Sequence, residues 1–161
     1  MKIIIRSMKL HDINQIIVIN EGAMAEHYPK ESWVCKFYEG KSHSFVAISA
    51  GMVIGYIACS ASYIVSFAVD SKFRGHGIGR QLLYHCLNTF ESPVYLHARV
   101  NNATALRLYQ SLNFIVRETL HDYYVSPIED AYLMEWKPSP GSGGMSTKCT
   151  DKINITAQIV P

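Results

Sequence analysis

Residues 42–69 contain no Asp, Glu, Lys or Arg, and this feature constrains the fold more than any other. An uncharged run of this length could span a bilayer. However, it is interrupted by "SAG" at 49–51 and by "CSAS" at 59–62, and it is rich in Val, Ile, Tyr and Phe, which favour strands. We therefore expect consecutive strands of a buried sheet here, and no transmembrane segment.

Composition supports a single globular domain. The chain has 161 residues, of which 48% are hydrophobic and 17% are charged, values that exclude a disordered chain. The formal net charge is only +2, and the Lys and Arg residues are scattered rather than clustered. Composition therefore gives no reason to expect a nucleic-acid partner, although a local basic patch for a phosphorylated ligand remains open.

The cysteines and the N-terminus bear on the compartment. Cysteines stand at positions 35, 59, 86 and 149, and none is closely spaced with another, so neither a zinc site nor a disulfide framework is indicated. We interpret them as mostly buried free thiols of a reducing compartment. The start, "MKIIIRSMKLHD", has too short an apolar run for a signal peptide, so we expect a cytoplasmic protein.

The spacing of apolar residues predicts a mixed α+β order of elements. Strands are expected at 3–6, 44–49, 52–60, 62–69, 92–100, 114–120 and 131–136. Helices are expected at 8–24, 30–40, 79–90 and 101–113, the last one behind an Asn cap. The β-α-β-α portion in the middle of this order resembles a crossover unit that borders a ligand site.

The composition changes near residue 138, which divides the chain into a domain at 1–137 and a tail at 138–161. The tail is rich in Pro, Gly and Ser and has no amphipathic pattern before residue 153, so we expect it to be flexible. Its "GSGG" followed by Met145 resembles a linker scar. An engineered addition and a natural low-complexity end are both open interpretations.

A glycine-rich segment, "RGHGIG" at 74–79, lies between an expected strand and an expected helix. It lacks the Lys-Ser/Thr pair of a P-loop, and its alternating glycines do not fit the dinucleotide fingerprint. Consecutive amides of such an R-x-x-G-x-G segment can wrap a pyrophosphate, helped by the positive N-terminus of the helix. The alternative is a glycine-rich loop that merely precedes a helix.

Three blocks of the sequence, in the same order, resemble the GNAT acetyltransferases. "YIVSFAVDSKFRGHGIGRQLL" at 63–83 resembles their acetyl-CoA-binding motif, and "YLHARVNNATALRLYQSLNF" at 95–114 resembles their second motif. "YYVSPIEDAYLMEW" at 123–136 resembles the end of the branch that acetylates protein N-termini, and "EHYP" at 26–29 is a weaker match. The resemblance covers roughly residues 3–137. It implies the GNAT fold: an α/β three-layer arrangement whose mixed, mostly antiparallel central sheet has two splayed parallel strands and flanking helices.

The resemblance also implies where the co-substrate acetyl-CoA binds. The end of one splayed strand would pair with the pantetheine arm, and the glycine-rich segment would meet the pyrophosphate through its amides. Asn102 would contact the cofactor, and Tyr109 would lie near its sulfur, with ordinary helix packing as the alternative for Tyr109. The implied cofactor-binding residues are Phe67, Ala68, Val69, Arg74, Gly75, His76, Gly77, Ile78, Gly79, Arg80, Asn102 and Tyr109.

Acetyl transfer to an amine needs a base, and His97 is the candidate. Strand alternation puts Tyr95, His97 and Arg99 on one face, and the ordinary pKa of histidine, about 6.5, suits a base near neutral pH. Bacterial ribosomal-protein acetyltransferases carry Glu at this place, whereas Met-directed eukaryotic relatives carry His together with a Tyr that matches Tyr63. A lone strand histidine is more often structural, but the matching Tyr63 favours catalysis. Tyr63, His97 and Tyr109 are the expected catalytic residues.

The peptide substrate would bind in the loop after the first helix and in the last hairpin. Glu26, Tyr28, Pro29, Tyr123 and Tyr124 match substrate-contacting positions of the family, and phenols can hydrogen-bond peptide carbonyls while packing on a side chain. Glu26 is also the alternative base. Its other interpretation is a solvated carboxylate at a helix end.

We expect an enzyme that moves an acetyl group from acetyl-CoA directly to the α-amino group of a protein N-terminus, with no covalent acyl-enzyme and no metal. Two alternatives are a GNAT enzyme that acts on a lysine side chain or a small amine, and a non-catalytic CoA-binding regulatory domain. No nucleic acid and no membrane are expected as partners. The sequence leaves open the preferred first residue of the substrate, an auxiliary subunit and the oligomeric state.

Overall fold

A computed structural model describes residues 1–23, 26–40, 42–140 and 155–156. Its elements are β1 (Lys2–Ser7), α1 (Ile13–Ala23), α2 (Lys30–Gly40), β2 (Phe45–Ser49), β3 (Met52–Ser60), β4 (Tyr63–Val69), α3 (Ile78–Leu87), β5 (Val94–Arg99), α4 (Ala103–Ser111), β6 (Ile115–Val125), β7 (Ile128–Trp136) and β8 (Ile155–Thr156). Short 3-10 turns stand at Leu10–Asp12 and Ser71–Phe73. The expected order of strands and helices over 1–137 is confirmed.

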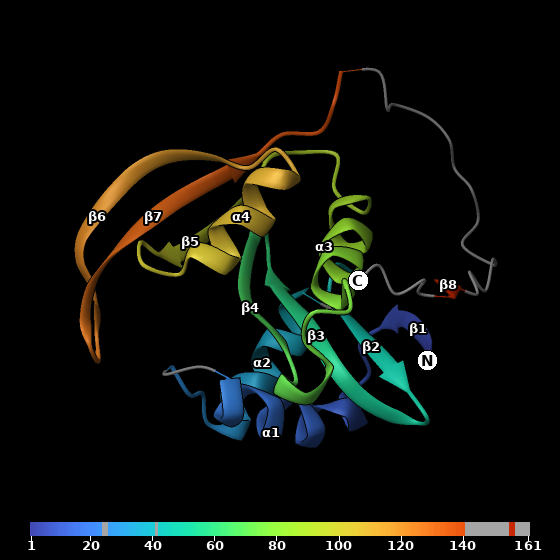
Figure 1. Cartoon of the computed structure of the whole chain (residues 1–161). Helices are drawn as coiled ribbons and strands as arrows, with labels where there is room; N and C mark the ends of the chain where they lie inside the picture. The colour runs from blue at the N-terminus through green and yellow to red at the C-terminus, as the bar shows by residue number, and fades with distance from the viewer. Residues whose placement is uncertain (24–25, 41, 141–154, 157–161) are drawn as a thin grey trace.

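The strands form one mixed sheet in the order β6-β7-β5-β4-β3-β2-β1-β8 (Figure 1). The uncharged segment at 42–69 supplies β2, β3 and β4, which pair antiparallel with one another, so the prediction of consecutive buried strands is confirmed. Seven of the nine residues of β3 are buried, because helices cover both faces of the sheet around it. No helix among the described residues has the length and apolar character that crossing a bilayer requires.

Helices on both faces of the sheet make three layers (Figure 1). On one face, α1 and α2 pack on β3 around a cluster that contains Ile16, Trp33 and Tyr56. On the other face, α3 packs on β1, β2 and β3 around a larger cluster that contains Leu82 and Leu83. The amphipathic pattern of α3 explains this placement, because its apolar residues recur at helical spacing and face the sheet.

Asp12 fixes the entry into α1. Its carboxylate accepts two hydrogen bonds from Arg6, at 2.7 and 2.8 Å, and a third from the backbone N–H of Lys9 at 2.8 Å. Asp12 is buried, and these charge-assisted bonds compensate for the loss of water around it. The same contacts tie α1 to the end of β1.

The sheet opens between β4 and β5, its one parallel pair of described strands. Only Tyr63 with Tyr95 and Ile64 with Leu96 are paired there. Beyond this point β4 stays paired with β3 as far as Val69, and β5 stays paired with β7 as far as Arg99. The two halves of the sheet therefore diverge, which confirms the expected splay of parallel strands.

The last hairpin is longer than expected. The sequence predicted strands at 114–120 and 131–136 around a polar turn, but β6 continues to Val125 and β7 starts at Ile128. The polar "HD" at 121–122 lies in a bulge, where Asp122 has a φ of 51° and its N–H donates to Asp130 Oδ1 at 2.9 Å. A bulge keeps polar residues inside a strand, so their polarity alone was a misleading sign of a turn.

Two of the expected buried thiols meet in the core. The Sγ atoms of Cys59 and Cys86 lie 3.5 Å apart, and both residues are fully buried. Cys35 on α2 is exposed, and Cys149 lies outside the described residues. Most of the expected tail at 138–161 also lies outside them, apart from 138–140 and the two residues of β8, which pair antiparallel with Lys2 and Ile3.

Candidate active site

The glycine-rich segment forms a turn that leads directly into α3. Gly75 and Gly77 have φ values of 79° and 74°, in the left-handed region that favours glycine, and Gly77 caps α3. The first helical backbone bond runs from the N–H of Gln81 to the carbonyl of Gly77. The amides between these two residues therefore have no partner within the helix and are available to an anion.

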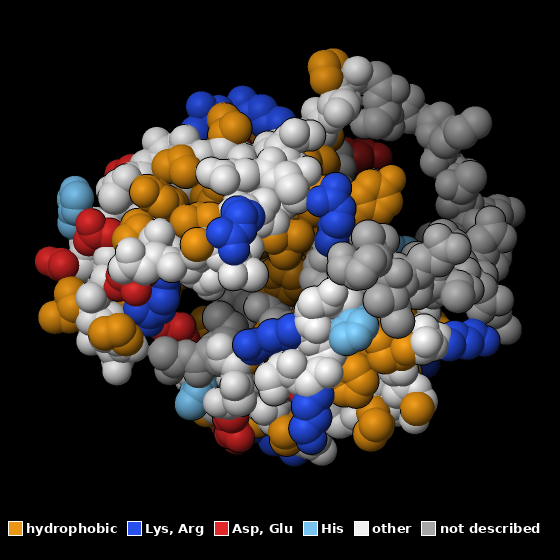
Figure 2. Space-filling view, in the orientation of Figure 1, with side chains coloured by type: hydrophobic (Ala, Val, Ile, Leu, Met, Phe, Trp, Pro, Cys, Tyr) orange, Lys and Arg blue, Asp and Glu red, His pale blue; other side chains and the backbone are white. Residues whose placement is uncertain are grey.

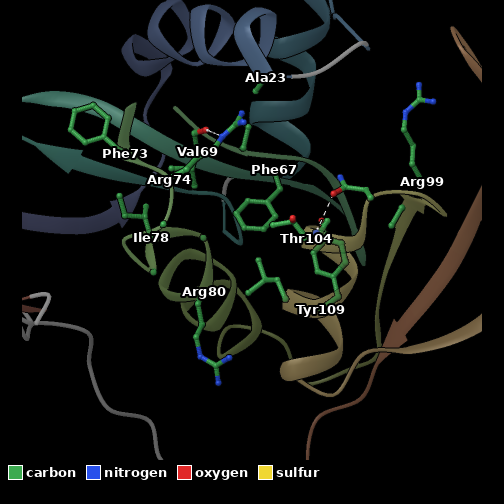
Figure 3. A pocket seen from close by; sticks show the side chains of 18 of the residues that line it. Ala23, Phe67, Val69, Phe73, Arg74, Ile78, Arg80, Arg99, Thr104 and Tyr109 are labelled. Atoms are coloured by element: carbon green, nitrogen blue, oxygen red, sulfur yellow. Dashed lines mark hydrogen bonds between the residues drawn. The ribbon is translucent and has the colours of Figure 1, made fainter. Parts of the chain in front are cut away.

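A cavity of about 770 Å³, here called the loop cavity, lies beside this turn. Figure 2 shows the corresponding face of the molecule hollowed, with Lys and Arg side chains around the hollow and apolar side chains inside it. Figure 3 shows Phe67 and Tyr109 near its centre, Arg74 and Ile78 towards one end, and Arg99 towards the other. Most of the expected cofactor-binding residues line it: Phe67, Ala68, Val69, Arg74, Gly75, Gly77, Ile78, Gly79, Arg80, Asn102 and Tyr109.

His76 is the exception among the expected cofactor-binding residues. Its side chain is exposed and folds back on the turn, with Nδ1 2.9 Å from the carbonyl oxygen of Arg74 and 3.2 Å from that of Phe73. It is not among the residues that line the loop cavity. Its position between Gly75 and Gly77 made it part of the expected cofactor-binding segment. Its ring, however, lies outside the loop cavity and contacts the carbonyls of the turn.

The start of α4 also borders the loop cavity. Asn102 caps this helix, because its Oδ1 accepts a hydrogen bond from the N–H of Ala105 at 3.2 Å. Thr104, which sequence reasoning did not single out, lines the cavity next to it. The loop cavity is thus bordered by the N-termini of two helices, and both favour negative charge.

A second cavity, also of about 770 Å³, adjoins the first and is here called the tyrosine cleft. It is lined by Tyr28, Tyr63, Tyr123 and Tyr124, and also by the cationic side chain of Lys36. Pro29 does not line it, because this exposed residue precedes α2, where its carbonyl accepts the N–H of Trp33. The residues that border both cavities are Glu26, Phe67, His97, Tyr109 and Tyr124.

His97 stands where the two cavities meet, between two tyrosine rings. Its imidazole is stacked on Tyr63, with centroids 5.9 Å apart, and on Tyr123, with centroids 4.7 Å apart. Partial burial lowers the pKa of His97 below its ordinary value of 6.5. The imidazole is therefore neutral at neutral pH, which is the form that accepts a proton.

Two further phenols, those of the buried Tyr109 and the half-buried Tyr124, border both cavities at this junction. Tyr109 on α4 is 9% exposed and packs near Phe67, with ring centroids 6.4 Å apart, and burial raises its pKa. Burial, followed by the nearby charge of Glu26, raises the pKa of Tyr124 to about 12. Both phenols therefore keep their protons at neutral pH and can donate hydrogen bonds.

Arg99 is a residue of this region that the sequence analysis did not assign to the site. Its guanidinium forms an ion pair with Glu26 and lies 4.0 Å above the centroid of the Tyr124 ring. Strand alternation predicts that Arg99 lies on the same face of β5 as His97, and this was the only sequence feature that pointed to a place in the site. Glu26 comes from the segment between α1 and α2, so the contact depends on tertiary packing.

No group of three or more His, Cys, Asp or Glu side chains gathers as metal ligands would, over the ranges that the structure describes. The site instead consists of two adjoining cavities, one bordered by free amides and the other by phenols, with a neutral imidazole between them. Such an arrangement can bind an anionic molecule on one side and remove a proton on the other.

Comparison with known proteins agrees with this geometry. Residues 10–114 match the model of the acetyltransferase (GNAT) family. An N-alpha-acetyltransferase of Sulfurisphaera tokodaii is 35% identical over 151 aligned positions, which cover 81% of this chain and 90% of the relative.

Two solved structures extend the comparison. Ard1 from Thermoplasma volcanium is 29% identical with a TM-score of 0.76, over 83% of this chain and 96% of the other. A chain of the NatC complex bound to Gag peptide and CoA shares the fold, with a TM-score of 0.79 at 21% identity, over 86% of this chain and 100% of the other. The family model covers most of the domain, and the N-alpha-acetyltransferase relatives are matched over nearly their whole length. The chain therefore belongs to the acetyltransferase (GNAT) family, in the branch of its N-alpha-acetyltransferase relatives.

Proposed function

We propose that this protein transfers the acetyl group of acetyl-CoA to the α-amino group of protein N-termini. The observation that carries the proposal is the junction of the two cavities at His97 and Tyr109, where an acyl donor and an amine can meet. The names of its relatives support the same activity, and the NatC structure contains both CoA and a peptide.

Acetyl-CoA would occupy the loop cavity as the donor substrate. The free amides at the start of α3 and the side chains of Arg74 and Arg80 fit its phosphates. Ala68 and Val69 belong to the part of β4 that β5 leaves unpaired, so this strand edge is open to an extended, amide-bearing arm, apart from the Val69 carbonyl, which accepts a hydrogen bond from Arg74 Nε at 3.1 Å. Gly79 fits this interpretation, because a Cβ there would stand 3.3 Å from the Phe67 ring and narrow the cavity.

His97 would act as the general base, with Tyr63 stacked on its ring and the Tyr63 hydroxyl holding the water that passes the proton. The substrate nitrogen attacks the thioester carbonyl, the C–S bond breaks, and the proton lost by nitrogen passes to the neutral imidazole directly or through one water. Burial supports this role, because it keeps His97 unprotonated at neutral pH. Glu26 is the second candidate base, since it also borders both cavities.

Tyr109 would supply the proton that the leaving thiolate needs. Its phenol borders both cavities and stays protonated because burial raises its pKa. Transfer is then direct, within a complex of both substrates: an amide and a thiol form, and the phenolate left on Tyr109 regains a proton from the imidazolium of His97, directly or through water. Cys59 and Cys86 lie in the core cluster under α3 and do not border either cavity, so they offer no acyl-enzyme route.

The peptide N-terminus would enter through the tyrosine cleft. Tyr28, Tyr123 and Tyr124 present phenol oxygens that can bond peptide carbonyls, while their rings pack against the first side chains. Pro29 would act only by setting the start of α2.

We also propose a cytoplasmic site of action, which the free thiols Cys35, Cys59 and Cys86 favour, and a domain that ends near residue 137. An auxiliary subunit would be a further partner, as the NatC neighbour is itself a complex.

A peptide panel tests the proposal. Peptides that start with Met-Leu, Ser, Ala and Glu are compared with a peptide whose terminus is blocked and whose only amine is a lysine. Acetylation of free termini alone supports the proposal, whereas acetylation of the blocked peptide would assign the enzyme to lysine. Binding of acetyl-CoA without any product would support the regulatory alternative.

A further inference from the structure

We propose that Arg99 is a positioning residue that holds the two walls of the tyrosine cleft at the spacing a peptide needs. The inference rests on the proposed function, because it assigns the walls to a peptide substrate. One wall is the segment at 26–28, between α1 and α2. The other is the end of β6 with the turn at 126–127.

A single guanidinium contacts both walls. On one side, Arg99 Nη2 donates to Glu26 Oε1. On the other side, Nη2 donates to the carbonyl of Ser126 and Nη1 to that of Pro127, both at 3.2 Å. The planar fork of arginine suits this task, because its N–H groups point in fixed directions to several acceptors at once.

The charges around Arg99 make these contacts hard to replace. Nη1 also lies 3.5 Å from Glu129 Oε1, so one cation serves two carboxylates. The Arg99 side chain is 17% exposed and that of Glu129 is 14% exposed, so water replaces a lost partner only in part. Loss of the guanidinium would leave Glu26 of one wall and Glu129, on β7 directly after the turn of the other wall, as unscreened like charges that push the walls apart.

The position of Arg99 links these walls to the chemistry. It stands two residues after His97 on the same face of β5, and its guanidinium lies over the ring of Tyr124, which borders both cavities. A shift of either wall therefore changes where a peptide amine lies relative to His97. Such a misplacement of about 1 Å can cost a rate factor on the order of a hundred.

The test compares Arg99→Met with a matched control, Arg117→Met. Arg117 also pairs with a glutamate, Glu135 on β7, but it borders neither cavity. We expect R99M to raise the peptide KM by about tenfold or more and to lower kcat as well, so that kcat/KM for the peptide falls by roughly a hundredfold. R117M should leave the peptide KM within about twofold of the wild type, the scatter expected of an uninvolved site.

Two further variants separate positioning from simple stability. Arg99→Lys keeps the charge without the fork and should restore KM only in part; if R99M does not fold, R99K provides the same comparison. In a double-mutant cycle with Glu26→Gln, the effects of R99M and E26Q on the peptide KM should not be additive, because both variants remove the same Arg99–Glu26 ion pair. Equal KM values for R99M and R117M, or a change confined to the melting temperature, would overturn the inference.

Hydrogen exchange gives a readout that does not need activity. In R99M, amides at 26–28 and 122–126 should exchange faster, and in R117M they should not. Unchanged exchange in R99M would refute the coupling of the two walls. A wild-type protein that acetylates no peptide would instead refute the proposed function, so the two failures are distinguishable.

Discussion

Ile64 on β4 and Leu96 on β5 form the last backbone pair before the sheet opens. Past this pair the two strands keep only their outer partners, β3 and β7. The opening separates the loop cavity from the tyrosine cleft, and His97, the next residue after Leu96, stands between them. The chemistry proposed for this protein depends on that one interruption of the parallel ladder.

Gly77→Asp should remove most of the stabilisation that acetyl-CoA gives. The added carboxylate would face the phosphates beside the start of α3, and repulsion weakens binding and hence the linked stability. The measurement is the melting temperature with and without acetyl-CoA. Gly51→Asp is a matched control, because Gly51 also has a positive φ, of 78°, and open space around it, but lies in the β2–β3 turn. If acetyl-CoA raised the melting temperature of G77D as much as that of the wild type, the assignment of acetyl-CoA to the loop cavity would be wrong.

His97→Ala and Tyr63→Phe should each lower kcat by roughly ten- to a thousandfold, the size expected when a general base or its water is lost. Affinity for acetyl-CoA should change little, because neither residue belongs to the glycine turn. His85→Ala is the control: His85 is also a partly buried histidine that packs on an aromatic ring, that of Phe45, but it lies on α3 away from both cavities. If both His97→Ala and Tyr63→Phe kept the wild-type kcat, the base would be another residue, and Glu26 would be the next candidate to test.

The acid limb of the rate profile should lie below pH 6.5. Burial lowers the pKa of His97, so the imidazole stays neutral, and competent as a base, to a lower pH than free histidine. Rate then falls as pH drops through this lowered value. Measurement of kcat for the wild type and the His97→Ala variant between pH 5 and 9 checks the assignment. An identical acid limb in both proteins would show that another group titrates.

Folding stability should also decrease as pH falls below 6.5. Burial lowers the pKa values of His43, His85 and His97, so the unfolded chain binds more protons than the folded one in the interval from 6.5 down to the lowered values. Stability therefore rises with pH through that interval and levels off above it.

Urea unfolding between pH 5 and 7.5 measures this dependence. His43→Phe should flatten it, because phenylalanine keeps the stacking on Phe90 but does not titrate. A slope as steep in H43F as in the wild type would mean that His43 contributes nothing to it.

Deletion of residues 138–161 should leave the activity within a few fold of the full chain. Among the described residues of this region, those of β8 pair with Lys2 and Ile3 at the edge of the sheet, and so short a pairing adds little to a core built by 1–137. Unfolding and peptide acetylation of the truncated protein test the boundary. A truncated chain that does not fold would show that residues near 155 belong to the domain.

Local pattern predicted most of the fold, whereas the residues of the candidate site were indicated mainly by the resemblance to the GNAT family. The uncharged stretches of 42–69, rich in Val, Ile, Tyr and Phe, predicted three consecutive strands, and the glycine-rich segment at 74–79 predicted a loop before a helix. Asn102 was identifiable as a cap for the same reason. These features depend on residues within a few positions of one another, so sequence spacing is sufficient to reveal them.

Other features were decided only by tertiary structure. Glu26 and Arg99 are 73 positions apart and meet because the sheet brings β5 beneath the segment after α1. The bulge at Asp122 lengthened the last hairpin, and packing of α3 on β3 brought Cys59 to Cys86. No local pattern records which distant segments become neighbours, because the burial of apolar faces selects the register and the layer in which each element lies.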